Sequence, residues 1–230
     1  MKDIQIMDPK EIIARRVSLE IRPKMLVNLG IGIPTLVSDH LDESMGVFFQ
    51  SENGVVGLGH RPPEGMTDRH LTDAGGSFTS AVPGASIIDS AFSFGLIRGG
   101  HLDLTVLGGL QVDAQGHLAN WMIPGVFVPG MGGAMDLVTG AKKVIVAMIH
   151  SAKGKSKIVQ ECNLPVTSQR RVDLIVTEPL LTVTKEVCNE TLYGPGESCG
   201  NFVPLADDGD AYDTYVYRIG ITNEETSGNV

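Results

Sequence analysis

The sequence is poor in basic residues and in cysteine, and both shortages exclude classes of protein. Its 18 Lys and Arg residues face 27 Asp and Glu residues, which gives a net charge of −9 at pH 7. A field of this sign repels phosphate, so we expect no binding to nucleic acid or to anionic membranes. Cys162, Cys188 and Cys199 are an odd set without Cys-x-x-Cys spacing, which suggests neither a disulfide framework nor a zinc site.

The sequence also lacks long apolar runs and has few aromatic residues. No window comes near the roughly eighteen consecutive apolar residues of a membrane span, and Met1-Lys2-Asp3-Ile4 begins no apolar signal segment, so we expect a cytoplasmic protein. Hydrophobic residues still make up 42% of the chain, which is enough for a sizeable core, and aromatic residues are only 5%, so that core must be mainly aliphatic. We expect a single domain over residues 1–230.

Short apolar runs, separated by glycines, recur along the chain. They are residues 25–29, 47–49, 102–107, 144–148, 174–176 and 181–183. Short runs rich in Val, Ile and Leu are typical of strands that are buried on both faces, as in a parallel sheet covered by helices. The pattern therefore predicts an α/β fold with an open, doubly wound, mostly parallel sheet and helices on both faces.

Three helices are expected around these strands. Asp8 can cap a first helix that has Pro9 at its first position, and Pro23 ends that helix. Two shorter helices are expected over residues 35–41 and 135–140, where one follows the first apolar run and the other precedes the fourth.

A glycine-rich turn lies between the first apolar run and the helix expected after it. Gly30 and Gly32 would let a ligand approach the backbone closely, and the N–H groups at a helix N-terminus favour an anion. This is also how a dinucleotide-binding unit holds a pyrophosphate. Thr35, however, stands where such a unit has its third glycine, which it needs for close packing of the helix on the strand.

An acidic residue, Glu52, directly follows the second apolar run. It therefore lies at the carboxyl end of a strand, the edge at which open α/β sheets bind their ligands. An acid about 20 positions beyond the first glycine binds the ribose in dinucleotide-binding units. Against this, Asn53-Gly54 imposes a tight turn immediately after the acid. These residues alone leave three interpretations open, namely a ribose ligand, a catalytic carboxylate and a purely structural turn.

A third glycine cluster covers residues 130–133 and opens the helix expected over residues 135–140. Successive N–H groups of such a stretch can point at one oxygen atom and so stabilise an oxyanion. A sharp loop that needs positive φ angles would have the same composition. The residues alone favour neither interpretation.

Five sequence blocks, taken together and in order, carry a family resemblance. They are residues 28–34 (Asn-Leu-Gly-Ile-Gly-Ile-Pro), 50–54 (Gln-Ser-Glu-Asn-Gly), 97–101 (Ile-Arg-Gly-Gly-His), 118–125 (Leu-Ala-Asn-Trp-Met-Ile-Pro-Gly) and 130–137 (Gly-Met-Gly-Gly-Ala-Met-Asp-Leu). Over roughly residues 10–185 the chain closely resembles the beta-type half of family I coenzyme A transferases, of the 3-oxoacid and butyrate–acetoacetate type.

The resemblance implies a role for several of these residues. Glu52 would be the nucleophile, which forms a γ-glutamyl coenzyme A thioester in a ping-pong reaction. The backbone at Gly133 and Ala134 would bind coenzyme A and stabilise the oxyanions. No cofactor or metal is implied, because the coenzyme A thioester is itself a substrate. Further candidates for the loops around the acyl site are Gly30, Gly32, Asn53 and Gly132.

The resemblance also implies partners. The chain would work with a companion alpha-type subunit in a hetero-oligomer, on an acyl-CoA and a short carboxylic or 3-oxo acid such as acetoacetate. Two other functions are weighed against this one: an acyl-CoA hydrolase that uses the same glutamate, and a non-catalytic nucleotide-binding module. From about Lys185 the chain departs from the family pattern, and residues 186–230 are expected to form a divergent C-terminal segment.

Overall fold

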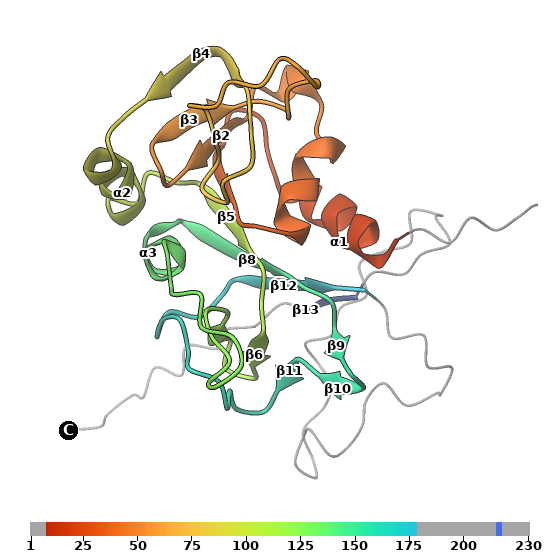
Figure 1. Cartoon of the computed structure of the whole chain (residues 1–230). Coiled ribbons are helices and arrows are strands. Elements are labelled where there is room, and N and C mark those ends of the chain that lie inside the picture. Colours follow the sequence, from red (N-terminus) through yellow and green to blue (C-terminus); the bar gives the residue numbers. More distant parts are fainter. Residues whose placement is uncertain (1–7, 179–214, 218–230) are drawn as a thin grey trace, which may run out of the picture.

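The computed structural model describes residues 8–178 and the backbone of residues 215–217. Within them, eight strands form one sheet in the order β13-β12-β8-β5-β1-β2-β3-β4 (Figure 1). Its strands are β1 (Leu26–Leu29), β2 (Phe48–Ser51), β3 (Val55–Leu58), β4 (Ala81–Ile87), β5 (Leu104–Leu107), β8 (Lys143–Ala147), β12 (Leu174–Thr177) and β13 (Tyr215–Tyr217). The strands from β12 to β2 are mutually parallel, whereas β3, β4 and β13 pair antiparallel at the two ends.

The remaining elements are short. The helices are α1 (Pro9–Ser18), η1 (Ile33–His40), η2 (Glu43–Met45), α2 (Ser90–Arg98) and α3 (Ala134–Gly140), of which η1 and η2 are 3₁₀-helices. A small sheet consists of β6 (Gln111–Asp113), β7 (Leu118–Ala119) and β11 (Ile158–Val159), and a hairpin consists of β9 (Ser151–Ala152) and β10 (Lys155–Ser156). Among the described residues, no helix is long and apolar enough to cross a membrane.

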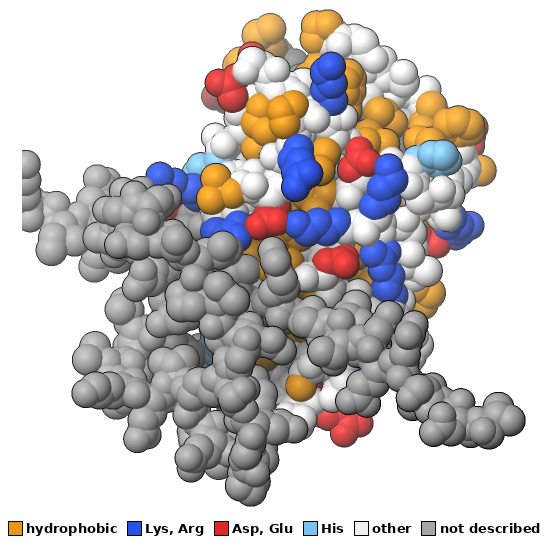
Figure 2. All heavy atoms as spheres, turned by 180° about the vertical axis from the view of Figure 1, so that it is seen from behind, with side chains coloured by type: hydrophobic (Ala, Val, Ile, Leu, Met, Phe, Trp, Pro, Cys, Tyr) orange, Lys and Arg blue, Asp and Glu red, His pale blue; other side chains and the backbone are white. Residues whose placement is uncertain are grey.

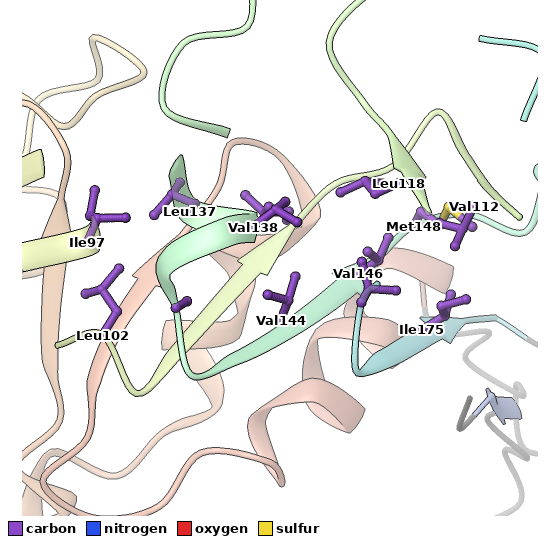
Figure 3. Close-up of a cluster of buried hydrophobic side chains, with 13 residues drawn as sticks. Ile97, Leu102, Val112, Leu118, Leu137, Val138, Val144, Val146, Met148 and Ile175 are labelled. Atoms are coloured by element: carbon purple, nitrogen blue, oxygen red, sulfur yellow. The ribbon is translucent and has the colours of Figure 1, made fainter. Parts of the chain in front are cut away.

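The central strands are buried on both faces, as their apolar runs predicted. In β8, Val144 and Val146 belong to one hydrophobic cluster and Ile145 and Ala147 to another, because alternate side chains of a strand point to opposite faces. The first cluster includes residues of α2 and α3, and Figure 3 shows it above the strands. The second includes residues of α1 and η1, which lie on the opposite side of the sheet from α2 and α3 in Figure 1. The prediction of a mostly parallel α/β sheet with helices on both faces is confirmed.

The first helix begins as predicted but ends earlier. The Asp8 side chain accepts a hydrogen bond from the Lys10 N–H at 3.0 Å, and Pro9 occupies the first turn. The helix ends at Ser18, ahead of Pro23, and the chain passes through a turn between them. The proline therefore does not itself end the helix, although proline and the residue before it disfavour any continuation.

The other differences from the predicted elements have physical reasons. The helix expected over residues 35–41 is the 3₁₀-helix η1, and the short third helix is present as α3. Helix α2 and strands β3 and β4 were not predicted. Strand β4 lies at the edge of the sheet and has no buried residue, so it produces no apolar run. The apolar run at residues 181–183 and most of the predicted C-terminal segment lie outside the described residues.

Acidic and basic side chains are interspersed on the face shown in Figure 2. One ion-pair cluster links α1 to the start of β8: Glu20 accepts hydrogen bonds from Arg16 at 2.9 Å and from Lys143 at 2.5 Å. Burial works to raise the pKa of Glu20, but the bonds from Lys143 and Arg16 outweigh it and hold the pKa below its usual value. This cluster fastens the first helix to the sheet.

Candidate functional site

Glu52 lies immediately after β2, at the carboxyl edge of the parallel part of the sheet. Strands β1 and β2 are in parallel register, with Asn28 opposite Gln50. The Asn28 amide Nδ2 reaches over this edge and donates a hydrogen bond to Glu52 Oε2 at 3.2 Å. Glu52 is half-buried, whereas Asn28 is only 1% exposed. The Glu52 carboxylate is therefore held on its sheet side by the buried Asn28 amide, and part of the Glu52 side chain stays accessible to solvent.

The glycine cluster before α3 contacts this carboxylate. A Cβ atom placed on Gly133 would lie 3.2 Å from both Cγ and Oε1 of Glu52, so the backbone there packs directly against the side chain. Ala134 follows as the first residue of α3 and is half-buried, and its N–H donates to the Met131 carbonyl at 3.3 Å, close to the upper limit for such a bond. The structure thus brings together two predicted site residues, Glu52 and Gly133, which are far apart in the sequence.

A chain of buried polar side chains lies beneath Glu52. Gln50 Oε1 accepts from Asn28 Nδ2 at 3.0 Å, and Gln50 Nε2 donates to Ser93 Oγ of α2 at 2.8 Å. Ser93 in turn donates to the Ser51 carbonyl at 3.4 Å, and Thr105 of β5 donates to Asn28 Oδ1 at the same distance. Buried polar groups need partners, and this chain supplies them within the core of the sheet.

A small hairpin over residues 71–79 is fastened to both neighbours of Glu52. The Ala74 N–H donates to Ser51 Oγ at 2.9 Å, and Asn53 Nδ2 donates to the Thr72 carbonyl at 2.8 Å. Asn53, which was predicted to lie in an acyl-site loop, is therefore the anchor of this hairpin. At the tip of the hairpin, a Cβ on Gly75 would lie 3.2 Å from the side chain of Ile31, which follows β1. The hairpin is thereby held at the residues on both sides of Glu52.

The other predicted loop glycines differ in what surrounds them. A Cβ on Gly30 would lie 3.1 Å from the Val106 carbonyl, so this glycine permits close packing of β1 on β5. Gly32 has φ +90° and Gly132 has φ +53°, and no described atom lies within 4 Å of a Cβ placed on either one. Both are exposed and hold backbone geometry that favours glycine.

Sequence reasoning missed the polar support of the site. Asn28, Gln50, Ser93 and Thr105 were not predicted as site residues, although a polar residue inside an apolar run, such as Asn28, is a usable signal. Burial raises the pKa of the Cys162 thiol to about 11, so this thiol stays protonated at neutral pH. In the described part of the chain, no three His, Cys, Asp or Glu side chains gather as they would to bind a metal ion.

Comparison with known proteins gives close relatives. A family model described as Coenzyme A transferase matches residues 10–189. The beta subunit of the acetate CoA-transferase of Escherichia coli (strain K12) is 55% identical over 173 residues, which cover 75% of this chain and 79% of that protein. The corresponding subunit of the succinyl-CoA:3-ketoacid coenzyme A transferase of Helicobacter pylori (strain ATCC 700392 / 26695) is 52% identical over 170 residues, which cover 74% of this chain and 82% of that protein.

Solved structures share the fold at lower identity. Glutaconate coenzyme A-transferase from Acidaminococcus fermentans superposes with a TM-score of 0.56 at 16% identity, over 77% of both chains. An acyl-CoA transferase from Escherichia coli O157:H7 superposes with a TM-score of 0.54 at 22% identity, over 74% of this chain and 34% of the other. The chain therefore spans about a third of that longer protein.

Proposed function

Because the chain belongs to the coenzyme A transferase family, as its sequence blocks predicted, we propose that it transfers coenzyme A between carboxylic acids through a covalent intermediate on Glu52. The observation that supports this most is the placement of the Glu52 carboxylate. It is half-buried at the carboxyl edge of the sheet, with the Asn28 amide on one oxygen and the Gly133 backbone beside the other. A ribose ligand would not need a neighbouring backbone held this close.

The two carboxylate oxygens have different surroundings, and this assigns them different tasks. Asn28 Nδ2 holds Oε2, so Oε1, which lies beside Gly133, is the attacking atom. Oε1 attacks the carbonyl carbon of the donor thioester, the C–S bond breaks, and the coenzyme A thiolate leaves. The product is a mixed anhydride between Glu52 and the donor acid. A carboxylate is already ionised at neutral pH, so this step needs no general base.

The thiolate then returns to the glutamyl carbonyl carbon. The bond between that carbon and Oε1 breaks, and the donor acid departs with Oε1 as one of its carboxylate oxygens. Glu52 is left as a γ-glutamyl coenzyme A thioester whose carbonyl oxygen is the former Oε2. An acceptor carboxylate reverses the sequence, restores an oxygen to Glu52 and leaves as the new thioester. All bonds are exchanged, and no oxidant or hydrolytic water takes part.

Each addition step places negative charge on a former carbonyl oxygen, and the site offers donors for both kinds of oxyanion. Gly133 lies beside Oε1 and Ala134 is the next residue, and we propose that the backbone of these two residues faces the substrate carbonyl that Oε1 attacks. The long bond from the Ala134 N–H to Met131 leaves that donor available for a closer acceptor. Asn28 Nδ2 serves the oxyanion that forms on the glutamyl carbonyl. One such donor contributes about 3 kcal/mol to transition-state stabilisation.

Substrate and partner follow from the relatives. The Escherichia coli relative is named as a subunit of an acetate CoA-transferase. The Helicobacter pylori relative is named as a subunit of a succinyl-CoA:3-ketoacid coenzyme A transferase. We therefore propose a short carboxylic or 3-oxo acid such as acetoacetate as acceptor, an acyl-CoA as donor, and an alpha-type subunit as the partner in a hetero-oligomer. Coenzyme A enters as substrate, and no metal or further cofactor is proposed.

The test is covalent trapping on Glu52. The full chain, assembled with its alpha-type subunit, is incubated with acyl-CoA and then treated with borohydride, which reduces a glutamyl thioester to an alcohol. Peptide mapping is expected to find the modification on Glu52, and Glu52→Ala is expected to abolish both labelling and transfer. Glu64→Ala, which changes an exposed glutamate in the loop after β3, is the control and keeps both. Labelling on another residue, or near-normal transfer by Glu52→Ala, contradicts the proposal.

Product analysis separates transfer from hydrolysis. In the presence of an acceptor acid, the transferase converts that acid into its coenzyme A thioester, and free thiol does not accumulate. If acyl-CoA disappears at the same rate without any acceptor, water takes the acyl group and the chain is an acyl-CoA hydrolase. Either result leaves the labelling of Glu52 unchanged, so the two measurements answer different questions.

A further inference from the structure

The orientation of the Asn28 amide is fixed by the proposed nucleophile and by Gln50, a residue that does not itself reach the substrate. Asn28 Nδ2 faces three acceptors, namely the Gln50 carbonyl and Gln50 Oε1, both at 3.0 Å, and Glu52 Oε2 at 3.2 Å. None of these oxygens can donate. Were the amide reversed, Oδ1 would face three acceptors and the nucleophile would lose its donor.

The Gln50 amide has two orientations, which differ by the exchange of Oε1 and Nε2. The partner on the side away from Asn28, Ser93, selects between them. Gln50 Nε2 donates to Ser93 Oγ at 2.8 Å. The Ser93 hydroxyl donates to the Ser51 carbonyl at 3.4 Å, and with its proton directed there Ser93 Oγ is free to accept from Gln50 Nε2. Gln50 therefore presents Oε1, and not Nε2, to Asn28.

The chain of hydrogen bonds thus runs in one direction, from Thr105 through Asn28, Gln50 and Ser93 to the Ser51 carbonyl. Asn28 and Gln50 are each 1% exposed, and Ser93 and Thr105 are fully buried, so water does not offer substitute partners. A buried network of this kind holds its members in one arrangement as long as every member is satisfied.

We propose that Gln50 and Ser93 are positioning residues for the transfer reaction, which fix the Asn28 amide so that it donates to Glu52 Oε2 throughout the cycle. The inference rests on the proposed function, since it assigns a purpose to the donor on the nucleophile. Ser93 belongs to α2 and Gln50 to β2, so the orientation of a group in the site depends on the packing of a helix on the sheet. Neither residue touches the reacting atoms.

Two variants test the proposal in the assembled full-length enzyme. Ser93→Ala removes the acceptor for Gln50 Nε2 without adding volume, and Gln50→Met removes the link while it fills the same space. Each is expected to lower the rate of Glu52 acylation in a single turnover by about tenfold, because a charge-assisted hydrogen bond is lost for part of the population. KM for the acyl-CoA is expected to stay within about twofold, because the contact acts on the nucleophile.

Ser18→Ala is the matched control. Ser18 is also a buried serine, and its hydroxyl donates to the Arg15 carbonyl at 2.8 Å in α1, away from Glu52. Ser18→Ala is expected to lower Tm by about as much as Ser93→Ala does and to keep the wild-type rate of Glu52 acylation. If Ser18→Ala slows acylation as much as Ser93→Ala does, the effect is one of general stability and the proposal is wrong.

A spectroscopic measurement excludes a merely structural role. Isotope-edited infrared spectra of the trapped γ-glutamyl thioester report the hydrogen bond to its carbonyl oxygen, which lies where Oε2 was. We expect the stretching frequency to rise in Ser93→Ala and Gln50→Met and to stay unchanged in Ser18→Ala. The positioning proposal fails, and the proposed function stands, if the wild-type enzyme is labelled at Glu52 and both variants are acylated at the wild-type rate with an unchanged carbonyl stretching frequency. Should the wild type not label at Glu52, the proposed function itself fails.

Discussion

Replacing Gly133 by alanine separates the chemistry of the site from the stability of the fold. The added Cβ would lie 3.2 Å from both Cγ and Oε1 of Glu52. Carbon atoms pack at about 3.5 to 4.0 Å, so the methyl group must displace the carboxylate by about 0.3 to 0.8 Å. Displacements approaching 1 Å at a reacting atom can cost about a hundredfold in rate. We expect Gly133→Ala to lower the rate of Glu52 acylation about tenfold to a hundredfold.

The thermal stability of Gly133→Ala is expected to stay the same or to rise slightly, although its acylation rate falls. Gly133 has φ −81° and ψ −1°, a conformation open to any residue, and it precedes the first residue of α3. Alanine at such a position lowers the entropy of the unfolded chain and stabilises a protein by about 0.4 to 1 kcal/mol. Thermal unfolding should therefore show an unchanged or slightly higher Tm for Gly133→Ala.

The control for this variant is Gly95→Ala in α2. No described atom lies within 4 Å of a Cβ placed on Gly95, so the substitution stabilises the helix without displacing a neighbour. It is expected to raise Tm by a similar amount and to leave acylation unchanged. If Gly133→Ala acylates Glu52 at the wild-type rate, the backbone there does not confine the carboxylate, and the reasoning about the Oε1 side of the site is refuted.

Two further variants test the fold. Glu20→Gln breaks the link from α1 to Lys143 and Arg16, and it should destabilise the protein by about 1 kcal/mol at neutral pH. Because the pKa of Glu20 is lowered in the folded state, this contribution is present above the usual pKa of 4.5 and is lost as the pH falls through the lowered value. The Tm difference between wild type and Glu20→Gln should therefore shrink as the pH falls below 4.5. Gly54→Ala should be much more destabilising, by about 3 kcal/mol or more, because Gly54 has φ +114° and an added Cβ would collide with the Ile88 carbonyl. Urea unfolding would measure the loss in the free energy of unfolding. A Gly54→Ala protein of wild-type stability would show that the turn after Glu52 is not confined by its neighbours.

Much of the scaffold could be predicted because its signals are local. A strand buried on both faces needs a continuous apolar run, and the runs at residues 25–29 and 144–148 correspond to β1 and β8. The position of Glu52 followed from the same reasoning, because it directly follows such a run. Strand β4 has no buried residue, and an edge strand of that kind leaves no comparable trace in the sequence.

The support of the site could not be predicted because it depends on register. Asn28 reaches Glu52 only because β1 and β2 pair with Asn28 opposite Gln50, and no local pattern specifies which residues of two parallel strands face each other. Ser93 lies in helix α2, which follows the edge strand β4 and was not predicted, and its contact with Gln50 is set by the packing of that helix on the sheet. The resemblance to a family assigned the nucleophile, whereas the three-dimensional structure was needed for the residues that hold it.

The hairpin over residues 71–79 is anchored on both sides of Glu52, the proposed nucleophile. Ser51 and Asn53, the two residues that bond it, are also the covalent neighbours of Glu52. A longer or bulkier hairpin, introduced to admit a larger acid, would pull on the peptide units that set the direction of the carboxylate. A change in the hairpin is therefore linked mechanically to the direction of the Glu52 carboxylate, and Ile31, whose side chain lies against the hairpin tip, is a position at which the contact with the hairpin can be altered without changing either anchor.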